Sequence, residues 1–504
     1  MAAPGVRWRT QRKSWRRVTT AVRLERGAGW SRLQPRGRGR VVACARSDED
    51  VTMTASHAAQ SAWVRWRRAR GAVVWVAAYL LLVCAPLLLL LSGRVPPGAG
   101  LWWDLSMAFG FAGLAVMGVQ FALTARLRRA TAPFGIDIIY YFHRLAALVG
   151  IGLILAHWLI VRVAHGEALG SLDPLEAPGH MSAGRLALVF FLVLIGTSLW
   201  RKRLGLEYRR WRMLHTVVAT AAMLLAVIHV LGVGYYTGEG WKRWLWIGYT
   251  LSWVLLIVHV RVVKPWRMRQ RPYRVVEVRA EGGGTTTLTV TPDGHAGLRF
   301  APGQFAWLTA RASPFSFEEH PFSFSGSAEQ PGRLAFSIKA LGDFTRTVAT
   351  MEPGETVYLD GPYGVFSTER YPQARGFVFV AAGVGIAPIM SMLRTLADRG
   401  DRRPLLLIDA NRDLGSVIFR DELETLRARL ALRIVHVLED PPVDWPGERG
   451  RIDAALLRRV LPAALEGHEY FVCGPRVVSE IVQRELHALG VGLGHLHFEL
   501  FDMV

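Results

Sequence analysis

Four histidines are the residues whose type and spacing most directly suggest chemistry. His143 and His157 lie in one apolar stretch, His215 and His229 lie in another, and the members of each pair are fourteen positions apart. On an α-helix, fourteen residues span about 21 Å and fall about 40° short of four full turns. Both imidazoles of a pair therefore face the same side of their helix. Ionisable side chains inside apolar spans are costly and are usually kept for ligands, protons or ions.

The duplicated spacing favours haem ligation. A single histidine in a membrane helix is more often a packed or hydrogen-bonded residue than a metal ligand, but the same spacing on two helices that can lie side by side reverses that expectation. Zinc fits poorly, because its ligands must converge on one point and these pairs diverge toward opposite leaflets. Two bis-histidine b-type haems, stacked across a bilayer, would use all four imidazoles.

The elements that must position these histidines are membrane spans. Six apolar segments run near residues 71–92, 101–124, 136–161, 183–200, 213–233 and 242–262. Each is about long enough to cross the hydrocarbon core of a lipid bilayer. Segments rich in arginine and lysine alternate with connections poorer in these residues; the rich ones are 63–70, 125–130, 201–212 and 261–274. This alternation predicts a multi-pass plasma-membrane protein with both termini in the cytoplasm.

In that orientation His143 and His215 form an inner pair, and His157 and His229 form an outer pair. Arg144 follows His143 directly, and we predict that it pairs with a haem propionate, which is an anion near the membrane interface. The arginines at 209, 210 and 212 precede His215 and are explained mostly as ordinary cytoplasmic flanks.

Composition narrows the class of protein. The chain has 504 residues, 51% hydrophobic residues and a net charge of +21. Residues 1–70 contain 17 Lys+Arg and 4 Asp+Glu, which accounts for +13 of that charge, so nucleic acid is not needed to explain it. We predict that residues 1–65 form a disordered basic tail, with Met53 an equally sensible start, and that residues 66–264 form the di-haem domain. Three cysteines are too few for a thiolate-held iron-sulfur cluster or a disulfide framework.

Beyond Pro265 the composition changes to that of soluble domains. Short strand-like runs separated by turn residues, between Tyr273 and about Tyr358, predict a small antiparallel β-barrel within residues 268–370. From Gly376 strand and helix patterns alternate, which predicts a parallel sheet covered on both faces within residues 374–504. The expected fold is therefore a polytopic α-helical membrane domain, then a small barrel, then an α/β nucleotide-binding domain.

A glycine-rich turn follows the first strand of the α/β part. Gly383, Gly385 and Pro388 stand where that strand passes into a helix. Glycines let the backbone approach a pyrophosphate, and helix N-terminal amides bind it. A plain tight turn is the alternative, but the position at the carboxyl end of a strand favours a nucleotide. Arg412, after the next strand, favours the 2′-phosphate of NADPH, while Asp413 keeps NADH open.

Several segments, taken in order, resemble the ferredoxin-NADP reductase type of flavin domain. They are HPFSFSG (320–326), IKALGDFT (338–345), GPYG (361–364), AGVGIAP (382–388), VCGP (472–475) and HFELF (497–501). Together with six spans and two histidine pairs, residues 70–504 resemble the ferric reductase and NADPH oxidase superfamily, especially its bacterial ferric-reductase-like members.

The resemblance implies roles for individual residues. Ser323 would lie beside the isoalloxazine of FAD, His320 near the FAD phosphates, and Cys473 by the nicotinamide. The ring of Phe501 would cover the flavin, although three residues follow it where many relatives end, and a sheet-edge aromatic is the alternative. The residues implied in FAD binding also include Pro321, Phe322, Phe324, Ser325, Lys339, Gly342, Asp343, Phe344 and Thr345; Gly474 and Pro475 join the nicotinamide-nucleotide site, and Cys473, Glu499 and Phe501 are implied in catalysis.

The implied activity is that of an NAD(P)H-dependent oxidoreductase passing electrons through FAD and two haems to a small-molecule or metal-ion acceptor on the outer face. Oxygen-reducing eukaryotic relatives typically carry another histidine one turn beyond the outer ligand on the fifth span, and Val233 stands there in this chain. We therefore expect ferric iron as the acceptor. The alternatives are a superoxide-producing oxidase, a subunit that supplies electrons to an extracytoplasmic partner protein, and a haem-free membrane anchor for a cytosolic flavin reductase.

Overall fold

The computed structural model describes residues 70–128, 134–173, 175–463 and 465–500. The expected disordered tail and Phe501 lie outside these residues. Within them, six helices are long and apolar enough to cross a membrane, as predicted. They are Arg70–Leu90, α2 (Leu101–Thr124), α4 (Ile136–Ala164), α5 (Gly179–Leu199), α6 (Tyr208–Val233) and the continuous helix Gly240–Arg269, which comprises α7 (Gly240–Val258), a π-helical turn (His259–Val263) and α8 (Lys264–Arg269).

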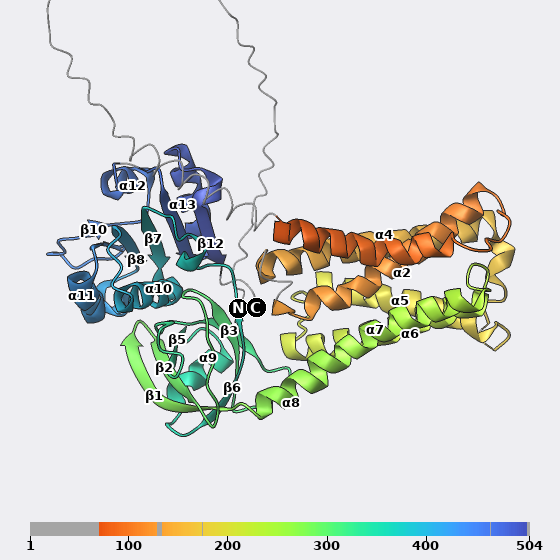
Figure 1. Ribbon diagram of the computed structural model, residues 1–504, viewed down its shortest axis with the longest axis horizontal. Coiled ribbons are helices and arrows are strands. Elements are labelled where there is room, and N and C mark those ends of the chain that lie inside the picture. The colour runs from red at the N-terminus through yellow and green to blue at the C-terminus, as the bar shows by residue number, and fades with distance from the viewer. Residues whose placement is uncertain (1–69, 129–133, 174, 464, 501–504) are drawn as a thin grey trace, which may run out of the picture. The chain divides into compact units, whose positions relative to one another are not determined.

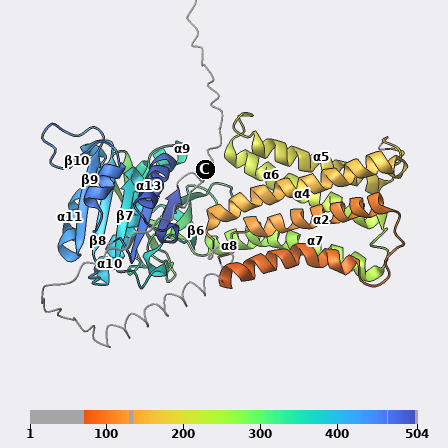
Figure 2. The same cartoon turned by 90° about the horizontal axis from the view of Figure 1, so that it is seen from above.

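The bundle is built from two closely packed helix pairs. α2 packs mainly against α4, and α5 packs mainly against α6, and Figure 2 shows these helices running alongside one another. Small residues allow the close approach: a Cβ at Gly113 of α2 would lie 3.1 Å from the backbone oxygen of Gly150 of α4, and a Cβ at Gly232 of α6 would overlap Cβ of His180 of α5. α6 ends at Val233, and the next residue, Gly234, has a φ of 68°, in the left-handed region that favours glycine. Each ligand-bearing helix, α4 or α6, thus has a partner helix beside it.

The first soluble unit is a six-stranded antiparallel sheet within the described residues (Figure 1). Its strand order is β4-β3-β6-β1-β2-β5. A bridge between Phe324, which directly follows β4, and Phe336 of β5 joins the two edges and curls the sheet into a barrel. The bounds are β1 (Tyr273–Gly282), β2 (Thr285–Pro292), β3 (Phe305–Ala310), β4 (His320–Ser323), β5 (Leu334–Lys339), α9 (Asp343–Thr347) and β6 (Thr356–Tyr363).

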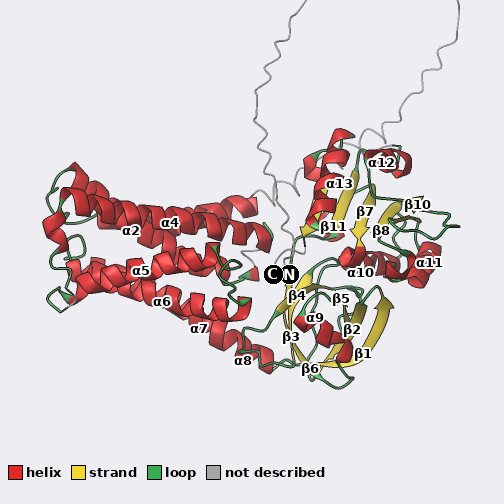
Figure 3. Cartoon of the chain, turned by 180° about the vertical axis from the view of Figure 1, so that it is seen from behind, coloured by secondary structure: helices red, strands yellow, loops and turns green. Residues whose placement is uncertain are grey.

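The second soluble unit is a parallel sheet with helices on both faces, and Figure 3 shows its strands in yellow, separate from those of the barrel. The strand order within the described residues is β10-β9-β8-β7-β11-β12. Alternate residues of β7 pack into two different cores, Phe377 and Phe379 on one face and Val378 and Val380 on the other. The bounds are β7 (Gly376–Ala382), α10 (Ile386–Asp398), β8 (Leu405–Asn411), α11 (Arg420–Arg429), β9 (Leu432–Leu438), β10 (Glu448–Arg449), α12 (Ala454–Val460), β11 (His468–Gly474), α13 (Arg476–Ala488) and β12 (Leu496–Leu500).

The order of the strands creates a crevice beside β7. The chain passes from β7 outward to β8 and β9, and then returns to the other side of β7 to form β11 and β12. In open parallel sheets, ligands bind outside the carboxyl ends of the strands at such a switch point. The turns after β7 and β11 are therefore the expected place for a nucleotide.

Candidate cofactor sites

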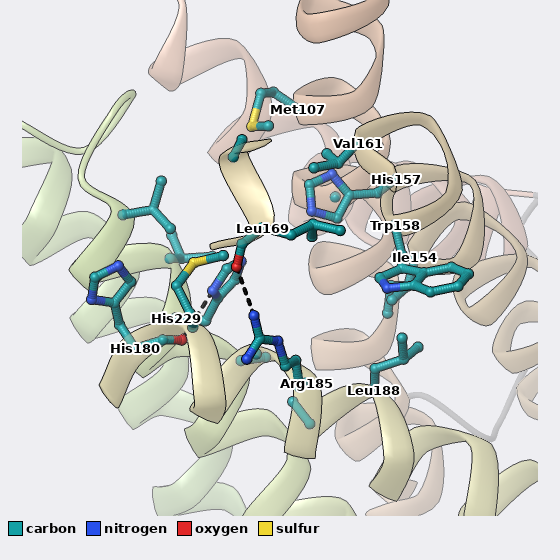
Figure 4. A pocket seen from close by; sticks show the side chains of 18 of the residues that line it. Met107, Ile154, His157, Trp158, Val161, Leu169, His180, Arg185, Leu188 and His229 are labelled. Atoms are coloured by element: carbon teal, nitrogen blue, oxygen red, sulfur yellow. Dashed lines mark hydrogen bonds between the residues drawn. The ribbon is translucent and has the colours of Figure 1, made fainter. Parts of the chain in front are cut away.

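Each predicted histidine pair lines a cavity of its own in the bundle. His157 of α4 and His229 of α6 line a cavity of about 420 Å³, named the outer cavity after the predicted orientation, and Figure 4 shows their imidazoles on either side of it. His143 of α4 and His215 of α6 line a second cavity of about 350 Å³, named the inner cavity in the same way. The fourteen-residue spacing thus places one imidazole from each helix at each of two depths.

The hydrogen bonds of the outer pair define its tautomer. Nδ1 of His157 donates to the backbone oxygen of Ser106 at 2.9 Å, and Nδ1 of His229 donates to the backbone oxygen of His180 at 3.1 Å. An imidazole whose Nδ1–H is engaged by a carbonyl keeps the lone pair of Nε2 for a metal. Both outer histidines are therefore arranged to ligate through Nε2.

The inner pair is not fixed in this way. Nδ1 of His215 lies 3.4 Å from Oγ of Ser198, and Nδ1 of His143 is buried with no hydrogen-bond partner among the described residues. The described residues also contain no group of three or more His, Cys, Asp or Glu side chains able to hold a metal ion. Two imidazoles at each depth in apolar cavities suit a haem, which brings its own equatorial nitrogens.

Arginines line the edge of the inner cavity, but Arg144 is not one of them. Arg144 is exposed. Among the residues that the structure describes, the arginines that line the cavity are Arg126, Arg212 and Arg261. The structure therefore corrects the expectation that Arg144 lies next to a propionate. Successive helical residues are rotated by about 100°, so the residue after an inward-facing histidine turns away from it.

A half-buried carboxylate pairs with two of these arginines. Oε1 of Glu319 lies 2.8 Å from Arg126 and 2.7 Å from Arg212. Burial alone would raise the pKa of Glu319, but the charges of Arg126 and Arg212 lower it to about 2. Arg126 also lies 3.9 Å from Asp360. Together with Arg261, three arginines still outnumber these two carboxylates, and this surplus of positive charge suits the two carboxylates of a haem.

The outer cavity holds polar residues that the sequence pattern did not reveal. His180 and Arg185 of α5 line it together with Val233, and Arg185 donates to the backbone oxygen of Leu169 at 2.6 Å (Figure 4). An imidazole is therefore present in this cavity, although it comes from α5 and not from the position of Val233. Only the packing of α5 on α6 brings it there.

In the barrel, β4 carries the predicted flavin motif. The ring of His320 stacks on Phe344 at 4.0 Å, and the ring of Phe322 lies 6.0 Å from the same residue. Pro321 is half-buried between them on the strand, and Ser323 is 7% exposed. These residues remain at the barrel surface or close to it.

Phe324 and Ser325 occupy a different place from the one predicted. Both side chains are 0% exposed. Phe324 stacks on Phe300 at 4.0 Å, and Oγ of Ser325 accepts a hydrogen bond from Ser337 at 2.9 Å. Because both side chains contact protein on all sides, we assign them to the core of the barrel instead of to cofactor contact.

The second predicted FAD segment forms a loop at the end of β5. Lys339 is half-buried there, and Gly342 and Asp343 are exposed. Oγ1 of Thr345 accepts hydrogen bonds from the backbone N–H groups of Leu341 and Gly342, at 2.8 Å each. Thr345 thus shapes the loop that precedes α9.

The crevice between β7 and β11 brings the predicted nucleotide residues together. Gly383 has a φ of 57°, and a Cβ at Gly385 would overlap the backbone oxygen of Cys473. Only a glycine lets the start of α10 lie this close to the end of β11. Gly474 and Pro475 form the turn into α13, and Pro388 is buried in the first turn of α10.

The remaining predicted residues flank this crevice. Cys473 lies opposite Glu499 across β11 and β12, and burial raises the pKa of the Cys473 thiol well above its usual range. Burial also raises the pKa of Glu499 to about 8. Because of these raised pKa values, both Cys473 and Glu499 are largely protonated at neutral pH.

Arg412 directly follows β8, is exposed, and lies 3.4 Å from Asp440.

The fold and these sites define a class. The protein is a multi-pass membrane protein whose soluble half consists of the FAD-binding and NAD-binding domains of an NAD(P)H-dependent flavin oxidoreductase.

Comparison with protein families identifies the particular group. Three family profiles match in order: "Ferric reductase like transmembrane component" over residues 109–227, "FAD-binding domain" over 272–367 and "Oxidoreductase NAD-binding domain" over 379–484. The chain belongs to the ferric reductase and NADPH oxidase superfamily, which confirms the resemblance inferred from its motifs.

Individual relatives match over slightly less than half of the chain. The stachydrine N-demethylase reductase subunit of Rhizobium meliloti is 28% identical over 236 residues, which cover 46% of this chain and 66% of the relative. The glycine betaine monooxygenase reductase subunit of Chromohalobacter salexigens is 27% identical over 243 residues, covering 47% and 65%. The chain thus spans slightly less than two thirds of these relatives. The FAD/NAD-binding domain of a nitric oxide dioxygenase from Vibrio cholerae is 25% identical with a TM-score of 0.42, covering 46% of this chain and 98% of that domain.

Proposed function

We propose that this protein transfers electrons from cytosolic NADPH, by way of FAD and two b-type haems, to ferric iron at the outer face of the plasma membrane. When bound, FAD takes up an electron pair as hydride and passes electrons on singly, and each haem iron carries one electron. The observation that carries the proposal is that α4 and α6 each supply one imidazole to each of two separate cavities.

The chain's own residues position these groups. The four imidazoles would hold the irons of the two haems, and Gly383 and Gly385 would leave room for the nucleotide at the switch point. Ser323 on β4 would face the flavin.

Glu319 supports a link between the flavin motif and the inner cavity. It directly precedes His320 of β4, and its carboxylate contacts Arg126 and Arg212, which line that cavity. This contact, made by arginines of the predicted cytoplasmic flanks, supports entry of electrons at the inner cavity and their exit at the outer one.

The test compares His157→Ala with the unaltered protein. We expect two haems per chain in the unaltered protein, measured from a dithionite-reduced difference spectrum with haem quantification. The variant should lose the outer haem and fail to reduce an external ferric chelate, while NADPH still reduces its FAD. Undiminished transmembrane reduction in this variant would refute the electron path.

His165→Ala is a matched control. His165 follows the last residue of α4 and stacks edge-on against Trp103, and the proposal gives it no ligand role. This variant should keep both haems. A protein that binds no haem at all, and so has no b-type Soret band, would instead be a membrane-anchored flavin reductase.

The presence of His180 in the outer cavity favours a second candidate, reduction of O₂ to superoxide. An imidazole beside the acceptor can donate a hydrogen bond or a proton to a reduced oxygen species. Oxygen uptake measured beside ferric-chelate reduction separates the two acceptors. Turnover with neither would indicate that electrons pass to an extracytoplasmic partner protein.

A further inference from the structure

The same small arrangement occurs twice beside the outer cavity. On α2, the backbone oxygen of Ser106 accepts from His157, and on α5 the backbone oxygen of His180 accepts from His229. In both cases a glycine follows four positions later, Gly110 on α2 and Gly184 on α5. Residues four apart lie on the same face of a helix, so each carbonyl and its glycine face the same imidazole.

The two glycines leave space that the imidazole rings occupy. A Cβ at Gly110 would lie 3.1 Å from Cγ and Nδ1 of His157, and a Cβ at Gly184 would lie 2.6 Å from Nδ1 of His229. Such distances are shorter than ordinary van der Waals contact, so a larger residue at either position would displace the ring. Each glycine therefore permits the ring to approach the carbonyl closely enough for the hydrogen bond.

The α2 site has an additional contact. Oγ of Ser106 lies 2.9 Å from Nδ1 of His157 and donates to the backbone oxygen of His157 at 3.1 Å. Ser106 is fully buried. The hydroxyl ties α2 to α4 at the level of the outer imidazole, while the carbonyl is the acceptor that the two sites share.

The inner histidines lack this arrangement in the described part of the chain. His143 has no hydrogen-bond partner for Nδ1, and His215 has only the hydroxyl of Ser198 at 3.4 Å. All four histidines lie on α4 and α6, so these two helices alone do not explain why only the outer pair has carbonyl partners. The partners come from α2 and α5 beside the outer cavity.

We propose that Ser106 with Gly110, and His180 with Gly184, form two equivalent cradles that orient the outer imidazoles for haem ligation. Each cradle consists of a backbone carbonyl that engages Nδ1–H and a glycine that admits the ring. These four are positioning residues, and the inference rests on the proposed function, since it assumes that the outer cavity takes a haem. A carbonyl acceptor also makes an imidazole a stronger donor to iron, so the cradles lower the midpoint potential of the haem that they support.

The test places an alanine in each cradle and uses haem content and low-spin haem signals as readouts. Gly184→Ala introduces the closer contact, 2.6 Å, and should lower haem content from two to about one per chain. Gly110→Ala introduces the milder contact, 3.1 Å; it should keep both haems, shift one of the two electron paramagnetic resonance signals and raise the midpoint potential of that haem alone.

Two other glycines serve as controls. A Cβ at Gly196, also on α5, has its nearest neighbour at 3.7 Å, and a Cβ at Gly152, on α4, meets no atom within 4 Å. Gly196→Ala and Gly152→Ala should retain both haems with unchanged signals. Ser106→Ala keeps the carbonyl and should also retain both haems; loss of one would show that the hydroxyl, and not the shared carbonyl, is the essential acceptor.

The outcomes separate this inference from the proposed function. If the unaltered protein binds no haem, both the proposed function and the inference about the cradles are refuted. Two haems in the unaltered protein, with unchanged signals in both Gly110→Ala and Gly184→Ala, would overturn the cradles and leave the proposed function standing. If Gly184→Ala does not accumulate, Gly110→Ala alone decides between these results.

Discussion

The stability of the protein should depend on pH, because the carboxyl of Glu499 is buried in its protonated form. This residue lies opposite Cys473 in the neighbouring strand and is 7% exposed. Burial raises the pKa of its carboxyl from 4.5 to about 8. Between these two pH values the folded protein retains a proton that the unfolded chain has released. Replacing the carboxyl by the amide in Glu499→Gln removes the titration and keeps nearly the same shape.

The sign and size of the effect follow from this raised pKa. The contribution of the protonated carboxyl to stability is complete below pH 4.5 and is lost as the pH rises toward 8. The loss amounts to about 1.4 kcal/mol per pH unit, or on the order of 4 to 5 kcal/mol in total. Glutamine does not titrate, so Glu499→Gln should escape this loss. For a unit of about 240 residues the difference corresponds to roughly 10 °C in melting temperature.

The assay is thermal unfolding of the purified full chain in detergent, followed by FAD fluorescence between pH 5 and pH 8.5. The variant and the unaltered protein should melt together near pH 5, and the variant should melt higher by pH 8. Glu480→Gln is the control, because Glu480 is exposed on α13, and it should follow the unaltered protein throughout. Parallel melting curves for Glu499→Gln and the unaltered protein would show that Glu499 is ionised in the fold and would refute the reasoning.

Three further predictions concern the other sites. Glu319→Gln removes the carboxylate that Arg126 and Arg212 share and leaves Arg126 only the more distant Asp360 at 3.9 Å. The change should cost about 3 kcal/mol or more and slow haem reduction by NADPH in stopped-flow measurements; an unchanged rate would argue against the link to β4. The Cys473 thiol, whose pKa is raised by burial, should resist iodoacetamide at pH 8 until the protein is unfolded, as mass spectrometry would reveal, and rapid labelling of the folded protein would contradict its burial. Gly385→Ala, which places a Cβ against the backbone of Cys473, should abolish FAD reduction by NADPH while dithionite still reduces the haems; normal turnover with NADPH would show that the crevice tolerates the side chain.

Local regularities allowed much of this protein to be predicted. The membrane helices follow from the length and apolarity of their segments. The pairing of His143 with His215, and of His157 with His229, follows from the fixed rise and rotation of a helix, because the same spacing on two neighbouring spans places imidazoles at two matched depths. The barrel and the α/β unit follow from the change between strand-like and alternating patterns.

Tertiary structure decided everything that depends on residues distant in the sequence. Arg144 adjoins His143 in the chain but faces outward, whereas Arg126 reaches the inner cavity from another segment. Phe324 follows the flavin motif, yet the alternation of side chains along a strand turns it into the barrel core. The partners of the outer histidines lie 51 and 49 positions away. A sequence determines which way a side chain faces within its own helix or strand, but only the packing of one element on another determines what that side chain meets.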